Sequence, residues 1–401
     1  MPCRKSARRT FDATWQTSGF FFQRIPACNA SSCGEVRTTR NRSWVRRAGI
    51  TWRNPTFSCC TYGRNGSDRR GSARITWGTG TDSVTAGLVI EQISRADINV
   101  GYVQLLASLN GSVLVAHALP EIAEAIVPQI CRGEKVVALG LTEPRGGSDA
   151  AHLILRAQPC REGYRLNGEK TSISMATGAD YLLLFARTDE SKPAAGGVSA
   201  FIVPLDLDGI SRTQFDDLGS QAVGRGSIFF DDVLIGAECL LGKENEGFRQ
   251  VMQGFDFSRA LIGLQVLAAA EASLRETWQF ICEREAFGNP IAKYQGVTEP
   301  LAEAETLLQA AKLMCYRTLW LRDQSLAHTK EAAMCKWWAP KVAFDTIHQC
   351  LLLHGHSGYS RDLPHQQRLR DVMGLQIGDG TAQIQKMIIA RETIGRIAVP
   401  Y

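Results

Sequence analysis

The chain has 401 residues, of which 44% are hydrophobic and 21% charged, which is the balance of a globular protein with a sizeable core. It contains no run of about 18 apolar residues, so the sequence does not predict a membrane-spanning helix. The net charge of +5 is unevenly spread: residues 1–77 hold 14 Arg and one Lys against three acidic residues, a balance of +12 that leaves −7 for the other 324 residues. A basic surface for nucleic acid would have to lie in residues 1–77, which contain no recognisable binding motif. We therefore expect neither a nucleic-acid nor a membrane partner.

Residues 1–77 show no sustained helical or strand period and hold five of the 12 cysteines. Their Arg- and Ser-rich, acid-poor composition is typical of a targeting peptide. A frame-shifted translation of GC-rich DNA would also give an excess of Arg, Gly, Ser, Cys and Trp, and this interpretation fits the length and the cysteines better. A genuine, divergent segment is the third interpretation. The cysteines lack zinc-ligand spacing, so we expect no metal site.

The remaining cysteines are dispersed in apolar contexts, as in a protein with reduced thiols. We expect a cytoplasmic protein, with the mitochondrial matrix as the alternative if residues 1–77 include a targeting peptide.

Helical periodicity begins at Asp82, a residue type favoured at the N-cap of a helix. Apolar stripes predict three helices, at residues 82–94, 98–117 and 119–131. We interpret residues 78–133 as an N-terminal helical domain.

The period then changes to that of strands. Apolar and aromatic runs predict strands at residues 136–141, 164–166, 181–186, 199–203 and 227–230. Asn167-Gly168 is typical of a two-residue hairpin turn. Residues 134–240 are therefore predicted to form a compact, barrel-like β domain.

Helical patterns return near residue 246 and continue to the end of the chain. They predict four long helices, at about 246–284, from 301 onward, 330–353 and 380–398. Residues 241–401 are therefore predicted to form a four-helix bundle, and the whole chain to be an α+β protein.

Two motifs carry a resemblance to a known family. Residues 377–385 read Ile-Gly-Asp-Gly-Thr-Ala-Gln-Ile-Gln, and residues 141–149 read Leu-Thr-Glu-Pro-Arg-Gly-Gly-Ser-Asp. Over residues 78–398 the chain resembles the acyl-CoA dehydrogenase family, flavoenzymes that desaturate acyl thioesters. The family has Ile-Tyr-Glu-Gly-Thr and Thr-Glu-Pro-x-x-Gly-Ser-Asp at these places, and its fold has the same order of N-terminal helices, middle β domain and four-helix bundle. The family's first helices are not visible in residues 1–77, so the N-terminal domain is expected to be incomplete.

Further motifs match at compatible spacing. Residues 169–175 correspond to the family's Lys-x-Trp-Ile-Thr-Asn, with Ser172 at the Trp position. Residues 283–288 correspond to Glu-Arg-x-x-Phe-Gly, and residues 352–359 to a glycine-rich turn. His354 and His356 in that turn have no carboxylate partner in the pattern, so we expect no metal there.

The resemblance implies FAD as cofactor, an acyl-CoA as substrate and an electron-transferring flavoprotein as acceptor. It also implies a homotetramer or homodimer, because the arginine at position 284 reaches the FAD of a neighbouring subunit in the family. The implied FAD-site residues are Leu141, Thr142, Ser148, Ser172, Ser174, Arg284, Phe287, Gln295, Leu352, Gly355, His356, Thr381 and Gln383. The implied substrate-site residues are Ser148, Asp256, Arg259, Gly378 and Gly380.

Asp379 stands at the position of the family's catalytic glutamate and is the candidate base for the substrate α-proton. An alternative role is the N-cap of a helix beginning at Gly380. Some members carry the base at the position of Ser258, which cannot serve here. The shorter acid, together with Gly378 and Ser172 in place of two rings, favours a bulky, α-branched acyl group.

In these respects the chain resembles the cyclohexane-1-carboxyl-CoA dehydrogenase subgroup. A general short- or branched-chain acyl-CoA dehydrogenase is the alternative within the family. A non-catalytic or damaged flavoprotein acting as a scaffold is the alternative from another class.

Overall fold

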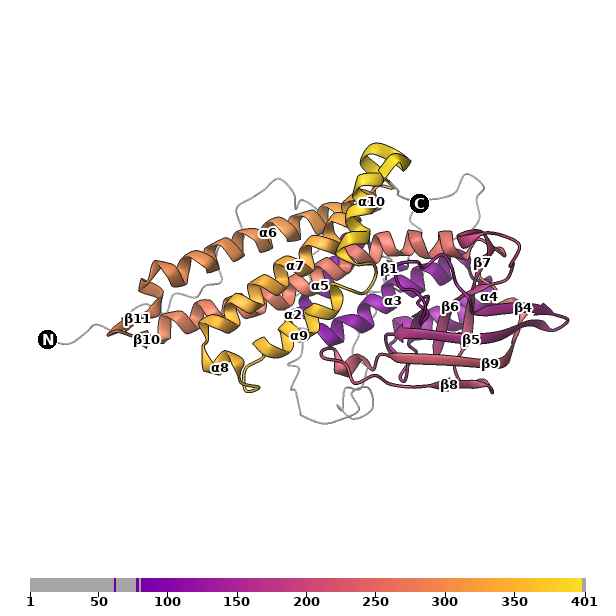
Figure 1. Ribbon diagram of the computed structural model, residues 1–401, viewed down its shortest axis with the longest axis horizontal. Coiled ribbons are helices and arrows are strands. Elements are labelled where there is room, and N and C mark those ends of the chain that lie inside the picture. Colours follow the sequence, from indigo (N-terminus) through magenta and orange to yellow (C-terminus); the bar gives the residue numbers. More distant parts are fainter. Residues whose placement is uncertain (1–60, 63–76, 79–80, 399–401) are drawn as a thin grey trace. The chain divides into compact units, whose positions relative to one another are not determined.

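The computed structural model describes residues 61–62, 77–78 and 81–398 (Figure 1). Two short strands, β1 (Thr61–Tyr62) and β2 (Trp77–Gly78), pair antiparallel. Apart from these two strands, residues 1–77 lie outside the described residues, and so do the three interpretations of that segment.

Three helices open the continuously described chain: α2 (Ser83–Ala96), α3 (Ile98–His117) and α4 (Pro120–Cys131). The predicted cap is confirmed, because the Asp82 side chain accepts a hydrogen bond of 2.8 Å from the backbone N–H of Thr85. Asp97 ends α2 and caps α3 in the same way, through the N–H of Asn99. The three predicted helices are found within two residues of the predicted ends.

A seven-stranded sheet follows, in the order β3-β6-β4-β5-β9-β8, with β7 paired to β6. β6 runs parallel to β3 and β4, and the other pairings are antiparallel. The strands are β3 (Val137–Gly140), β4 (Arg156–Cys160), β5 (Gly163–Ile173), β6 (Tyr181–Arg187), β7 (Val198–Pro204), β8 (Ile210–Arg212) and β9 (Gly226–Gly236).

The predicted hairpin turn at Asn167-Gly168 is wrong. Both residues lie inside β5, where the pairing with β9 shifts register. Gly168 has φ of +135°, and an added Cβ would meet the Leu155 Cα at 3.0 Å, so the glycine serves a bulge and a close backbone approach. The Asn167 side chain accepts from the N–H of Asp232 on β9, which ties the bulge to its partner strand.

The helical bundle consists mainly of α5 (Gly247–Glu283), α6 (Gln295–Asp323), α7 (Thr329–Leu353) and α10 (Ala382–Ile394). The shorter elements are β10 (Glu285–Ala286), β11 (Asn289–Pro290), α8 (His356–Tyr359) and α9 (His365–Leu375). The predicted long helices are found, although α10 is shorter than expected and α9 was not predicted.

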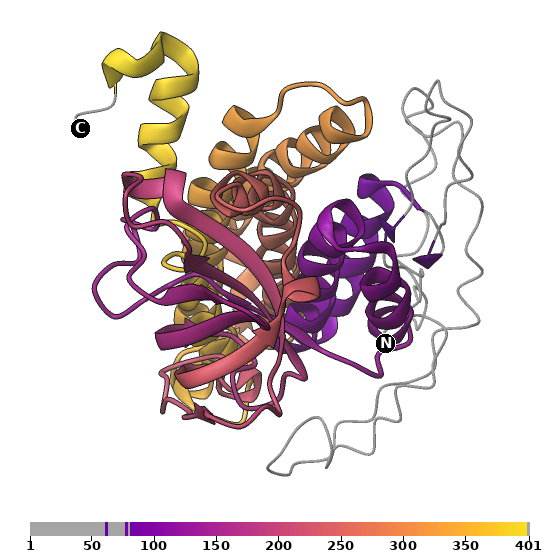
Figure 2. The ribbon, with the colours of Figure 1, turned by 90° about the vertical axis from the view of Figure 1, so that its right-hand side faces the viewer.

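Two apolar cores position the later site. One lies between α2, α5, α6 and α7. The other joins α3, α4 and the start of α5 to one face of the sheet. Figure 2, viewed from the end that carries the strands, shows the purple N-terminal helices beside the sheet. Among the described residues, α3 and α5 are long and apolar enough to cross a membrane, but most of each helix is buried within the fold, as in core helices.

Candidate functional site

A cavity of about 800 Å³ lies between α3, the sheet, the first half of α5 and the segment that joins α9 to α10. Ten of the predicted site residues line it, from three distant parts of the chain. They are Leu141, Thr142, Ser148, Ser172, Ser174, Arg259, Gly378, Asp379, Gly380 and Thr381. The structure thus brings both principal sequence motifs to one space.

A fully buried ion pair fixes the loop that follows β3. Lys170 on β5 donates to a Glu143 carboxylate oxygen at 2.6 Å and to the Leu141 carbonyl at 3.1 Å. The same carboxylate accepts from the N–H groups of Ile154 and Leu155, at 2.7 and 3.0 Å. All the groups that donate to this carboxylate come from other segments of the chain. They therefore attach the loop at residues 142–148, which carries hydroxyl side chains, to the sheet.

Ser172 marks an irregularity at the end of β5. Its φ is +59°, and the register with β9 shifts between Lys170 and Ile173. The Thr171 N–H meanwhile donates to the Thr142 carbonyl at 2.9 Å, joining the two motifs. Ser172 is exposed on the cavity wall, where its small side chain leaves space.

Asp379 lies in the left-handed region of backbone conformation, with φ of +55°, followed by Gly380 at +96°. The Gln385 side chain donates to the carbonyls of both residues, at 3.1 and 3.2 Å. The alternative role of Asp379 as the helix N-cap is wrong: the cap is Thr381, whose Oγ1 accepts from the Ile384 N–H. The Asp379 carboxylate is therefore free for another role.

Burial and three neighbouring side chains set the pKa of that carboxylate. Burial raises the pKa of Asp379, while the nearby cations Lys336 and Arg259 and a hydrogen bond from Ser258 lower it. The Ser258 hydroxyl lies 3.4 Å from Asp379 Oδ2. Burial and cations thus act in opposition on a carboxylate that faces a cavity, an arrangement found at general bases.

Arg259 belongs to α5 and lies next to Asp256. The two form an ion pair at 3.0 Å, and Asp256 also accepts from the Thr329 hydroxyl at 2.6 Å. Asp256 therefore orients the buried Arg259 rather than lining the cavity itself. The Arg259 Nε is buried without a hydrogen-bond partner among the described residues.

The sequence did not single out Tyr102 and Arg225, which also line the cavity. Burial raises the pKa of Tyr102, and the charge of Asp379 raises it further, so the phenol lies near the candidate base. Arg225 is paired with Asp217. Tyr102 sits in the apolar pattern of α3, and only the presence of a polar ring among aliphatic residues could have pointed to it.

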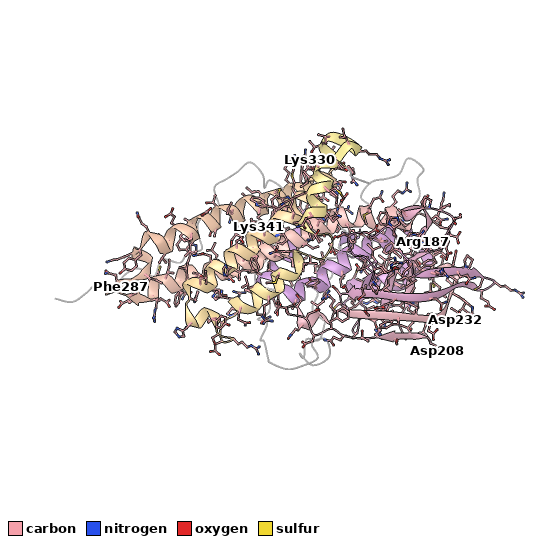
Figure 3. The ribbon with its side chains drawn as sticks, in the orientation of Figure 1. Arg187, Asp208, Asp232, Phe287, Lys330 and Lys341 are labelled. Carbon is pink, nitrogen blue, oxygen red and sulfur yellow. The ribbon has the colours of Figure 1, made fainter. Side chains whose placement is uncertain are left out.

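The other predicted FAD-site residues do not line the cavity. All seven are exposed: Arg284, Phe287, Gln295, Leu352, Gly355, His356 and Gln383. Phe287 is 95% exposed and lies at the end of the bundle opposite the strands that carry Arg187 and Asp232 (Figure 3). A single copy of the chain therefore does not bring the two predicted halves of the FAD site together.

The two histidines of the glycine-rich turn lie in different surroundings. His354 stacks on Phe280 and lies 4.4 Å from the buried His365 ring, centroid to centroid, whereas His356 is exposed. Within the described residues, no group of three or more His, Cys, Asp or Glu side chains could hold a metal ion.

Comparison with known proteins agrees with this geometry. The profile "Acyl-CoA dehydrogenase, middle domain" matches residues 138–233, and "Acyl-CoA dehydrogenase, C-terminal domain" matches residues 245–394. A probable acyl-CoA dehydrogenase of Bacillus subtilis is 32% identical over 79% of this chain and 84% of its own. A subunit of the caffeyl-CoA reductase–Etf complex of Acetobacterium woodii is 33% identical over 78% of this chain and 83% of its own.

A solved structure shows the same fold. Butyryl-CoA dehydrogenase from Megasphaera elsdenii superposes with a TM-score of 0.76 at 29% identity, covering 79% of this chain and 83% of that chain. The predicted fold class, with helices on either side of a middle β domain in sequence, is confirmed.

Proposed function

The chain belongs to the acyl-CoA dehydrogenase family, oxidoreductases that act on the CH–CH bond of an acyl-CoA, and from this premise we propose that it dehydrogenates a cyclic or α-branched acyl-CoA with FAD and with Asp379 as base. The observation that carries the proposal is the placement of the Asp379 carboxylate. It lies on the wall of the cavity that both motifs share, and it is not consumed as a helix cap.

The cavity fits the flavin end of FAD. Its wall carries hydroxyl side chains from the loop after β3 and from residues 171–174, and a flat heteroaromatic ring offers acceptors and donors for such groups. Thr142, Ser148, Ser172 and Ser174 would hold that ring. The buried Arg259 Nε, unpartnered among the described side chains, is a further donor at the same cavity. When bound, FAD supplies the acceptor for the substrate's β-hydride.

The side chains of the chain itself handle the proton. The Asp379 carboxylate takes the α-proton, which is only weakly acidic until the thioester oxygen is polarised. The backbone N–H of Asp379 would donate to that oxygen, as the family resemblance implies. Substrate that fills the cavity excludes water, which raises the pKa of Asp379 further toward the working pH.

Space beside Asp379 supports a bulky acyl group. A Cβ added at Gly378 would approach only the Gly374 carbonyl oxygen, at 3.8 Å, so a side chain there would extend into open space. Ser172 is likewise small and exposed on the opposite motif. Aspartate is one methylene shorter than glutamate, so the α-carbon must approach its backbone more closely. Cyclohexane-1-carboxyl-CoA is the acyl-CoA that these features favour.

The exposed second half of the FAD site supports an oligomer. Arg284 and Phe287 are exposed at the tip between α5 and α6, where a second copy could receive them against its own cofactor. We propose a homotetramer or homodimer on this basis. The relative in an Etf complex supports an electron-transferring flavoprotein as acceptor.

A substrate panel tests the proposed acyl group. Purified, FAD-loaded protein is mixed anaerobically with cyclohexanecarboxyl-CoA, isobutyryl-CoA and butyryl-CoA, and loss of visible flavin absorbance is followed. We expect fastest bleaching with the ring, and slower bleaching of the Gly378→Tyr variant with the ring only. Bleaching by butyryl-CoA alone would favour a general short-chain enzyme and overturn the cyclic substrate.

A further inference from the structure

Lys336 on α7 is a buried lysine directly beneath the segment that carries Asp379. We propose that Lys336 is a positioning residue for the base: its ammonium group fixes the backbone on both sides of Asp379 and keeps the carboxylate ionised and ready to accept a proton. This inference rests on the proposed function of Asp379 and assigns a role to a residue outside the cavity wall.

The surroundings of Lys336 are unusual for a lysine. The residue is 1% exposed, and its Nζ donates to the Leu375 carbonyl at 2.7 Å and to the Gly380 carbonyl at 3.4 Å. Among the residues that the structure describes, no carboxylate lies within 4.0 Å of this nitrogen. A buried charge held only by carbonyl groups costs folding free energy. Stability alone is therefore a weak reason for placing a lysine here.

The two carbonyls bracket the base. Leu375 is the last residue of α9, where unpaired carbonyls and the helix dipole favour a cation. Gly380 follows Asp379 directly. Gln385 of α10 holds the carbonyls of residues 379 and 380 from the other side, so α7 and α10 together clamp a turn whose two central residues have positive φ.

The charge of Lys336 also reaches the carboxylate. Among the groups that face Asp379, Lys336 lowers the pKa of the carboxyl most, and Arg259 of α5 has the next largest effect. Tyr102 of α3 faces it as a neutral phenol, and Asp256 neutralises part of the Arg259 charge. Burial lowers the pKa of Lys336 to about 8, with Asp379 acting to raise it. Lys336 is therefore mostly a cation at neutral pH, when the base must be ionised.

Arg391 of α10 also contributes to this field, because its charge lowers the pKa of Arg259. Removal of the Lys336 charge leaves Arg259, which is already paired with Asp256, as the remaining cation that lowers the pKa of Asp379. The pKa of Asp379 should then rise, by about one pH unit, since an opposite charge at close range commonly lowers a carboxyl pKa by about 1–3 units.

The test compares Lys336→Gln, Lys336→Met and Lys341→Gln in the FAD-containing protein. Lys341 lies about one turn and a half further along α7, is exposed and pairs with Asp345, so it controls for loss of a lysine charge from the same helix (Figure 3). The readouts are the acid limb of the pH profile of kcat/KM, hydrogen–deuterium exchange of residues 376–381, and FAD content. Lys336→Gln keeps a donor for one carbonyl, so it separates the charge from the backbone contact.

For Lys336→Gln and Lys336→Met we expect an acid limb about one pH unit higher, with FAD retained. Exchange in residues 376–381 should be fastest in Lys336→Met, which has no donor. Lys341→Gln should match the wild type in both readouts. An unmoved acid limb in the folded Lys336 variants, or failure of both to fold, overturns the role.

A different result would contradict the proposed function independently of the role of Lys336. If Asp379→Asn dehydrogenates the substrate at the wild-type rate, Asp379 is not the base, whatever the Lys336 variants do. If Asp379→Asn is inactive and the acid limb of the Lys336 variants does not move, only the role of Lys336 is wrong.

Discussion

Removal of Lys170 is expected to destabilise the protein and loosen its cofactor loop. In Lys170→Met the Glu143 carboxylate, whose side chain is 3% exposed, loses its only ion-pair partner among the described residues. Breaking a buried pair in this way costs about 3–5 kcal/mol. The N–H groups of Ile154 and Leu155 still bond to the carboxylate, so the lower end of that range, about 3 kcal/mol, is the expected loss.

The expected change in melting temperature follows from that free energy. A domain of this size loses about 2 °C for each kcal/mol, so Lys170→Met should melt about 6 °C lower than the wild type. Thermal unfolding followed by circular dichroism measures this shift, and flavin fluorescence in the same scan reports when FAD is released. Because Lys170 also bonds to the Leu141 carbonyl beside Thr142, FAD should be released before the helices unfold.

Two further variants separate the unpaired charge from the lost packing. Glu143→Gln combined with Lys170→Met removes both charges of this pair, so it should be more stable than Lys170→Met alone. Lys135→Met removes a half-exposed partner of Asp180 and should cost less than about 1 kcal/mol. The reasoning is refuted if Lys170→Met melts within about 1 °C of the wild type, or if the double variant melts below Lys170→Met.

Two predictions concern other parts of the fold. Burial and the neighbouring His354 lower the pKa of His365 to about 4, so the folded protein binds fewer protons there than the unfolded chain and should lose stability as pH falls from about 6.5 toward 4. His365→Gln should therefore show a smaller drop in melting temperature between about pH 7 and pH 5, and an equal drop would contradict the assignment. In Gly380→Ala the new Cβ would overlap with Gln385 Nε2 at a φ of +96°, so kcat should fall with the base displaced. Unchanged kcat in a folded Gly380→Ala protein would show that the turn tolerates displacement.

Local signals predicted the helices well because their caps and apolar stripes are short-range. Asp82 and Asp97 each bond to a backbone N–H within three residues. The strand β4 was missed because its side chains are largely exposed and it contains Pro159, so the apolar alternation is weak. The bulge at Asn167-Gly168 has the composition of a turn, and only the pairing with β9 distinguishes the two.

The candidate site could be predicted as far as motif resemblance reached. Thr142, Ser148, Ser172 and Asp379 were expected together and line one cavity. Lys336 was not predicted, because a lysine in a helical pattern resembles a solvated residue until the packing of α7 beneath residues 375–380 is known. Its two carbonyl partners are 39 and 44 positions away in the sequence, and contacts at such separations leave no trace in local periodicity.

The central claim is that Asp379 accepts the α-proton in an FAD-dependent dehydrogenation. The most direct measurement is anaerobic acyl-CoA titration of purified, FAD-containing wild type and Asp379→Asn, followed by visible flavin absorbance. The substituted side chain keeps the shape of the original, but its amide cannot act as a base at neutral pH. The account predicts rapid bleaching of the wild type and none of the variant, with FAD retained by both. Bleaching of the variant at the wild-type rate, or no bleaching of the wild type by any acyl-CoA, would contradict it.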